Sequence, residues 1–170
     1  KSFETKEEAT KAFEKGYEHY LKTASSSKAA AGLTPKTPVG IPIWESLCVD
    51  AACSGNPGNM EYRGVYPPTM QEIFRIGPLK KGTNNIGEFL ALVHGLALLK
   101  QKGSSLPIYS DSRNAIGWVK KKKCKTLLER VPENEPIFDM IERAEKWLKT
   151  NTYTTPILKW ETSEWGEIPA

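Results

Sequence analysis

Over residues 43–170, short apolar runs typical of strands are followed or interrupted by longer stretches with the apolar spacing of helices. Five short apolar runs bounded by turn residues predict strands, over residues 44–51, 62–66, 72–77, 107–110 and 156–160. Apolar residues at helical spacing predict helices over 85–102, 112–121 and 135–150. This order of elements predicts an α/β fold, in which helices pack on the faces of a mixed five-stranded sheet.

The first 42 residues have a different pattern. Residues 1–22 carry apolar side chains at helical spacing behind a capping box formed by Thr5 and Glu8, which predicts one helix. Residues 23–42 are rich in Ser, Ala, Pro and Gly, as is typical of a linker. The sequence therefore predicts a helix over 1–22, a linker over 23–42 and a main domain over 43–170.

Composition and charge narrow the function classes only slightly. The chain has 24 Lys and Arg against 20 Asp and Glu, and the net charge of +4 permits an anionic partner without requiring one. Five of the lysines fall within residues 120–125, which suits either a solvated helix end or a phosphate-facing patch. No apolar run is long enough to span a membrane. Three cysteines without C-x-x-C spacing favour reduced thiols and a cytoplasmic location over a disulfide framework or a zinc site.

Three acidic residues stand where the predicted elements begin or end. Asp50 and Asp111 each end an apolar run, and Glu88 lies near the start of the longest predicted helix. Carboxylates gathered at the ends of neighbouring elements are suitable ligands for Mg²⁺. Each acid also has an ordinary explanation: Asp50 as a turn residue, Glu88 as the acid of a capping box that begins at Asn85, and Asp111 as a helix N-cap.

The segments around these acids are more specific than the acids themselves. They are VDAACSGNPG from Val49, GTNNIGEF from Gly82 and YSDS from Tyr109. In order, spacing and residue types they resemble ribonuclease H of type 1, which cuts the RNA strand of an RNA/DNA hybrid. The resemblance implies the ribonuclease H-like fold. It also implies that Asp50, Glu88 and Asp111 are catalytic ligands of two Mg²⁺ ions, which Mn²⁺ can replace, in an in-line displacement at phosphorus.

Both ends of the chain carry further resemblances to this family. Residues 159–170, KWETSEWGEIPA, resemble the approach to the last catalytic Asp of the family, which is expected just past Ala170, so that the main domain lacks its C-terminal end. Glu167 matches an acid that the branch without the usual active-site His keeps beside the metal site, and the alternative is a solvated loop acid. The N-terminal helix resembles the last helix of the hybrid-binding domain that precedes some bacterial members, and the alternative is an ordinary helix docked on the main domain.

The resemblance also implies a set of contacts with the RNA strand. The 2′-hydroxyls that identify RNA are exposed in the minor groove, where small polar side chains can reach them. Asn56, Asn84 and Asn85 match positions along that groove. Arg113 stands where relatives often carry Gln, and it retains hydrogen-bond donors.

A second implied set concerns the DNA strand. The family has a phosphate pocket, whose matching residues here are Thr83, Asn85 and Thr126. The next residue, Leu127, replaces a polar side chain of close relatives. Trp118 matches an aromatic residue that packs on a deoxyribose, and the alternative is a core position of an amphipathic helix.

The sequence thus predicts a metal-dependent endoribonuclease whose partner is an RNA/DNA hybrid, with no membrane and no obligate protein partner. A hybrid-binding module without catalysis is the alternative. The missing last Asp favours that alternative, whereas three clustered like charges, which a pure binder does not need, oppose it. A transposase-like or exonuclease-like relative of the same fold is a third hypothesis, and the GNPG and TNN segments oppose it.

Overall fold

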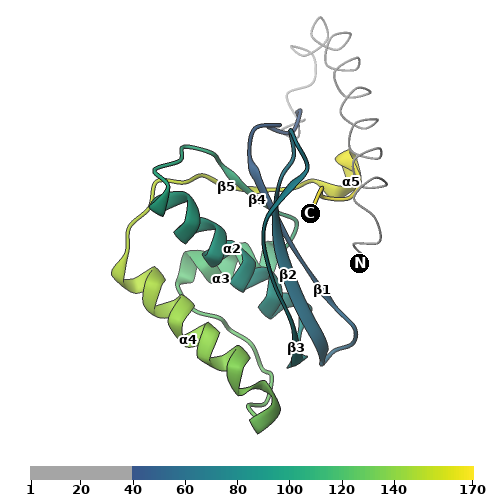
Figure 1. The fold of residues 1–170 in the computed structure, drawn as a ribbon, viewed down its shortest axis with the longest axis vertical. Helices are drawn as coiled ribbons and strands as arrows, with labels where there is room; N and C mark the ends of the chain where they lie inside the picture. The colour runs from purple at the N-terminus through teal and green to yellow at the C-terminus, as the bar shows by residue number, and fades with distance from the viewer. Residues whose placement is uncertain (1–39) are drawn as a thin grey trace, which may run out of the picture.

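The computed structural model describes residues 40–170, and the helix predicted over 1–22 lies outside the described residues, as does the linker up to residue 39. Strands β1, β2 and β3 are followed by helix α2, strand β4, helices α3 and α4, strand β5 and the short helix α5 (Figure 1). Their bounds are Leu47–Cys53, Gly58–Tyr66, Gln71–Gly82, Asn84–Gln101, Ile108–Ser110, Arg113–Lys121, Glu135–Thr150, Ile157–Lys159 and Thr162–Trp165, with a 3₁₀ turn at Pro132–Asn134.

The strands form one mixed sheet in the order β3-β2-β1-β4-β5, as the sequence predicts. The first three strands are antiparallel neighbours, whereas β4 is parallel to both β1 and β5. In Figure 1, helices α2, α3 and α4 lie on one side of the sheet and α5 lies on the other. The α/β fold class is therefore confirmed, and β1 lies at the centre of the sheet.

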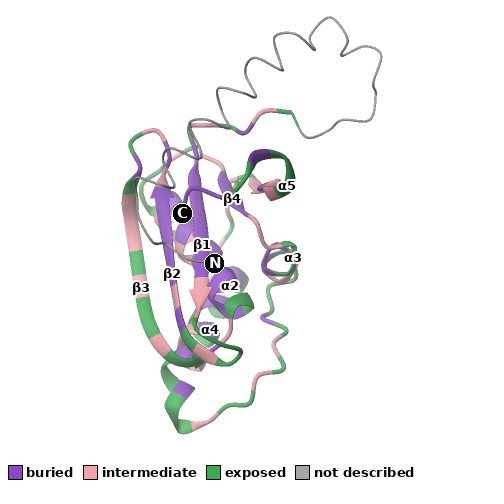
Figure 2. Cartoon of the chain, turned by 90° about the vertical axis from the view of Figure 1, so that its right-hand side faces the viewer, coloured by how far each residue is buried: buried purple, intermediate pink, exposed green. Residues whose placement is uncertain are grey.

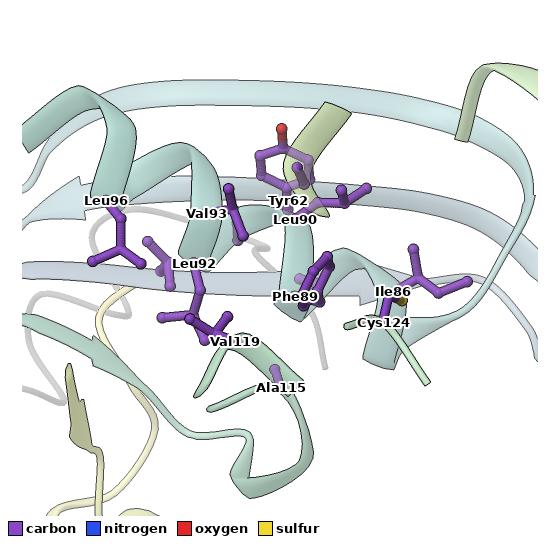
Figure 3. Close-up of a cluster of buried hydrophobic side chains, with 14 of the residues drawn as sticks. Tyr62, Ile86, Phe89, Leu90, Leu92, Val93, Leu96, Ala115, Val119 and Cys124 are labelled. Atoms are coloured by element: carbon purple, nitrogen blue, oxygen red, sulfur yellow. The ribbon is translucent and has the colours of Figure 1, made fainter. Parts of the chain in front are cut away.

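Helix α2 is the central helix of the main core. Thr83 caps it, because the Thr83 Oγ1 accepts a hydrogen bond from the Ile86 N–H at 3.3 Å. Most of its residues are buried, as its largely purple ribbon in Figure 2 shows, and Figure 3 shows apolar side chains that pack around it. Glycine permits a close approach to the sheet: a Cβ placed on Gly87 would lie only 2.8 Å from the Cβ of Ala51 on β1.

The two faces of the sheet carry separate apolar clusters. Leu47, Val49 and Ala51 of β1 belong to the cluster beneath α2, whereas Cys48 belongs to a cluster on the opposite face. The second cluster contains Tyr109, Trp160 and Trp165 among others, and the rings of Trp160 and Trp165 pack edge to face with their centres 4.9 Å apart. Because side chains of a strand alternate between faces, Asp50 belongs to the second face.

The observed elements differ from the predicted ones mainly at their ends. Strand β3 runs on to Gly82 instead of ending at Gly77, because it is an edge strand, where Pro78 need not interrupt a ladder of hydrogen bonds. Strand β2 begins at Gly58, before the predicted start at Tyr62, and β1 begins at Leu47, after the predicted start at Trp44. None of the helices in the described part is long and apolar enough to cross a membrane.

Candidate functional site

Three acidic side chains from three elements meet at one end of the sheet. Asp50 comes from β1, Glu88 from the second turn of α2, and Asp111 directly follows β4. Each offers a carboxylate oxygen, and these oxygens all lie within 4.8 Å of one another. Parallel pairing of β1 with β4 and the close packing of α2 on β1 bring the three acids together.

The local structure removes the ordinary explanation of each acid. Asp50 lies inside strand β1 and not in a turn. Helix α2 is capped by Thr83, so Glu88 does not occupy the capping-box position. Helix α3 is capped by Ser112, so Asp111 is not its N-cap. None of the three acids is therefore the turn residue, capping-box acid or N-cap that its ordinary explanation requires.

Two of the three acids are buried and Asp111 is half-buried, and this sets the electrostatics of the group. Asp50 is 1% exposed and Glu88 is 2% exposed. Burial raises the pKa of Glu88 well above its usual range, and the neighbouring charges of Asp50 and Asp111 raise it further. The Oε1 atom of Glu88 is buried and has no hydrogen-bond partner within the described part of the chain. A purely oxygen-donor set with excess negative charge fits hard divalent cations such as Mg²⁺.

Two adjoining hollows lie beside the start of α2. The first, of ≈ 380 Å³, has a wall of residues 125–128, and the second, of ≈ 420 Å³, has a wall of Cys53, Gly55 and Asn56. Both share Asn56, Thr83 and Asn85. Trp118 and Thr126 line the first and Asn84 lines the second. The structure thus gathers all the predicted substrate contacts except Arg113.

Local backbone structure explains why these polar side chains face outward. Asn84 and Asn85 are exposed because they are the first residues of α2, directly after its Thr83 cap. N–H groups at a helix start attract anions. Asn56 is exposed in the turn between β1 and β2, which the Ser54 hydroxyl closes by accepting from the Asn59 N–H at 2.9 Å.

Trp118 both packs in the core and faces the first hollow, and the lysines of residues 120–125 divide between an ion pair and that hollow. Trp118 is half-buried: it meets Phe89 edge-on at 6.3 Å between ring centres and also lines the first hollow. Among the lysines, the Lys123 ammonium lies 3.6 Å from a carboxylate oxygen of Glu145, whereas Lys125 lines the first hollow.

Arg113 lines neither hollow, and Glu167 is not one of the three acids that meet. Arg113 is exposed at the start of α3 and lines neither hollow. Glu167 is exposed in the segment after α5 and is not a member of the group of three acids. Their roles in substrate binding and catalysis stay predictions.

Sequence reasoning missed two residues beside the acids. Arg63 is a buried arginine opposite Asp50 on the neighbouring strand, and Gly87 sets the distance between α2 and β1. The position of Arg63 depends on strand register, and the role of Gly87 depends on which helix face meets the sheet. The available signal for Arg63 was a charged residue inside a predicted strand, between Tyr62 and Gly64.

Known proteins resemble this chain in sequence. The profile of the RNase H family matches residues 45–158. A ribonuclease H of Rhodopirellula baltica is 42% identical over 69 residues, which cover 39% of this chain and 43% of that protein. A ribonuclease H of Rippkaea orientalis is 33% identical over 102 residues, which cover 57% of this chain and 62% of that protein. The chain spans about half the length of these curated relatives.

Solved structures of the same name are also similar. LC11-RNase H1, isolated from compost, has a TM-score of 0.43 at 18% identity, over 71% of this chain and 87% of that chain. RNase H1 of Halobacterium salinarum has a TM-score of 0.43 at 19% identity, over 69% and 86% respectively. Because the family profile covers nearly the whole sheet and its helices, the chain belongs to the RNase H family.

Proposed function

We propose that this chain is an endoribonuclease that hydrolyses the RNA strand of RNA/DNA hybrids with two bound Mg²⁺ ions. The observation that carries the proposal is the meeting of Asp50, Glu88 and Asp111 within 4.8 Å in a protein of the RNase H family. Mn²⁺, which also prefers oxygen ligands, should replace Mg²⁺. The free thiols of all three cysteines are compatible with the proposed cytoplasmic location.

The three acids would hold the metal ions, and the ions when bound would activate a water and stabilise the leaving oxygen. Asp50 is the central ligand, because its strand adjoins both β4 and α2. The Ala51 N–H donates to the Asp50 Oδ1 at 2.9 Å, which orients this carboxylate. Glu167 is the proposed further catalytic acid.

The polar hollows would bind the two strands of the hybrid. Asn56, Asn84 and Asn85 would contact 2′-hydroxyls, with Arg113 as a further donor. Thr83, Asn85 and Thr126 would hold a phosphate of the DNA strand, and Trp118 would pack on a deoxyribose. The Thr83 hydroxyl accepts the bond that caps α2, so its own hydrogen remains available for a phosphate oxygen.

We also place the chain in the type 1 branch without an active-site His. His94, the histidine of the described part, supports this assignment because its ring contacts Tyr62 and Phe74. Its Nδ1 is 3.0 Å from the Tyr62 hydroxyl, and its ring stacks on Phe74 at 4.0 Å.

The test is hybrid cleavage by Asp50→Asn, with Asp139→Asn as the matched control. Asp139 is an exposed acid on α4 that pairs with Arg143 at 3.2 Å. We expect Asp50→Asn to bind a hybrid labelled on its RNA strand but to leave it uncut in Mg²⁺, whereas Asp139→Asn cuts it like the unsubstituted protein. Cutting by Asp50→Asn at a comparable rate would refute the proposal. Hybrid binding without cutting by the unsubstituted chain would instead support a binding module.

A further inference from the structure

The strand neighbour of Asp50 is a buried arginine. Arg63 on β2 lies directly opposite Asp50 on β1 in the register of the antiparallel pair. Directly opposed residues of such a pair project from the same face of the sheet. Arg63 is 4% exposed, and a guanidinium is rarely this buried without carboxylates around it.

An ion network leads from Arg63 toward the sheet edge. The Arg63 Nη1 donates to the Glu72 Oε2 at 3.2 Å, and the same oxygen accepts from the Arg75 Nε at 3.3 Å. The Arg75 Nη1 lies 3.3 Å from the Glu61 Oε1. The side chains of this network become more buried from Arg75, which is 44% exposed, toward Arg63, which lies closest to Asp50 in the sheet.

We propose that Arg63 is a built-in counter-ion of the Asp50–Glu88–Asp111 group, which competes with bound metal ions for the same negative charge. The proposal rests on the metal site of the proposed function. Three carboxylates within 4.8 Å repel one another when ionised, and a cation on the same face as Asp50 offsets that repulsion in the metal-free protein. Once divalent ions are bound, the same cation repels them.

The proposal has two consequences of opposite sign. Removing the charge of Arg63 should destabilise the metal-free protein, because both Asp50 and Glu72 lose a neighbouring cation. The same change should tighten Mg²⁺ binding, because the site becomes more negative. A residue that served only to pack the sheet would lower stability without raising metal affinity.

The experiment is a Mg²⁺ titration of the full chain without nucleic acid, at constant ionic strength. The thermal unfolding midpoint is followed against Mg²⁺ concentration, and Mn²⁺ binding is measured by calorimetry. For Arg63→Met we expect a lower metal-free midpoint and a roughly tenfold lower Kd for Mg²⁺. Arg63→Lys keeps the charge and should stay within about twofold of the unsubstituted protein, as should Arg75→Met, which changes the same network one strand further out.

An unchanged or weaker Mg²⁺ affinity in Arg63→Met would overturn the proposal. If Arg63→Met does not fold, Glu72→Gln is the deciding variant. It removes the acid that pairs with Arg63, so the affinity for Mg²⁺ should fall several-fold. An unchanged Mg²⁺ affinity in Glu72→Gln would overturn the proposal. Failure of the proposed function gives a different result. In that case Mg²⁺ does not raise the unfolding midpoint of the unsubstituted chain, or raises it equally in Asp111→Asn.

Discussion

Gly87 offers a sharp test of how the position of α2 controls the site. It precedes Glu88 on α2 and faces Ala51, the residue after Asp50 on β1. In Gly87→Ala, the new Cβ would lie 2.8 Å from the Ala51 Cβ and 3.2 Å from the Met60 Cγ. The Ala51 Cβ is fixed to the backbone of a central strand and cannot turn away, so the helix must move.

The size of the effect follows from these contacts. Two carbon atoms prefer a separation of about 3.5–4.0 Å, so the start of α2 must retreat from β1 by ~1 Å. Alanine gains up to ~1 kcal/mol over glycine as a helix former, whereas overpacking costs ~1–3 kcal/mol, so the free energy of unfolding should fall by ~0–2 kcal/mol. The displacement carries Glu88 away from Asp50, and a misplacement of ~1 Å at a reacting centre costs ~10²-fold in rate.

The assay is single-turnover cleavage of an RNA/DNA hybrid in Mg²⁺, with thermal unfolding measured alongside. Gly117→Ala on α3 is the first control: nothing lies within 4 Å of its added Cβ, so it should gain stability and cut normally. Gly95→Ala is the second control, because its Cβ would meet the Ile108 Cδ1 at 2.5 Å, two turns further along α2. Gly95→Ala should lose stability but retain more activity than Gly87→Ala. Cleavage by Gly87→Ala within about threefold of the unsubstituted rate would refute the reasoning.

Three further predictions concern the acids and the hollows. Because the pKa of Glu88 is raised in the folded protein, its contribution to the metal-free free energy of unfolding is greatest below its ordinary pKa of 4.5 and is lost as pH rises through the folded-state pKa. Glu88→Gln should therefore flatten this decline in denaturant titrations at several pH values. Cys53 lines the second hollow, whereas Cys124 is buried with its pKa raised to about 12 and Cys48 is buried too, so iodoacetamide should modify Cys53 first. Bound hybrid should slow that modification, and an equal rate with and without hybrid would contradict the proposed binding surface. Leu127 is 100% exposed on the first hollow, so Leu127→Thr should tighten hybrid binding by about 1 kcal/mol, measured as Kd, and leave the thermal midpoint nearly unchanged.

Periodicity in the sequence predicts the large elements well. The helix expected over 135–150 is observed as Glu135–Thr150, and the helix expected over 85–102 as Asn84–Gln101. Amphipathic spacing and clear end signals make such helices readable. The short helix α5 and the 3₁₀ turn at Pro132–Asn134 were not predicted, because a single turn shows no period.

The candidate site was predictable only in part, and from motifs and not from periodicity. Asp50, Glu88 and Asp111 were singled out by the segments around them and a family resemblance, and spacing alone left an ordinary alternative for each. Arg63 and Gly87 were not predictable in this way. Their importance comes from what lies opposite them on another strand or helix, and a one-dimensional pattern does not contain that register.

The order in which the acids occur along the chain has a consequence for folding. Asp50 and Glu88 belong to the contiguous segment from β1 to α2, whose antiparallel strands are joined by short turns. Asp111 joins them only when β4 pairs in parallel with β1, which it does at two pairs of residues. Strands β2 and β3 and helix α2 lie between these two strands in the sequence. Such non-local pairing is slow, because the intervening chain must be closed into a loop first. A partly folded chain that lacks the β1–β4 pairing would therefore hold two of the three proposed metal ligands, and the proposed cleavage of RNA would require that pairing.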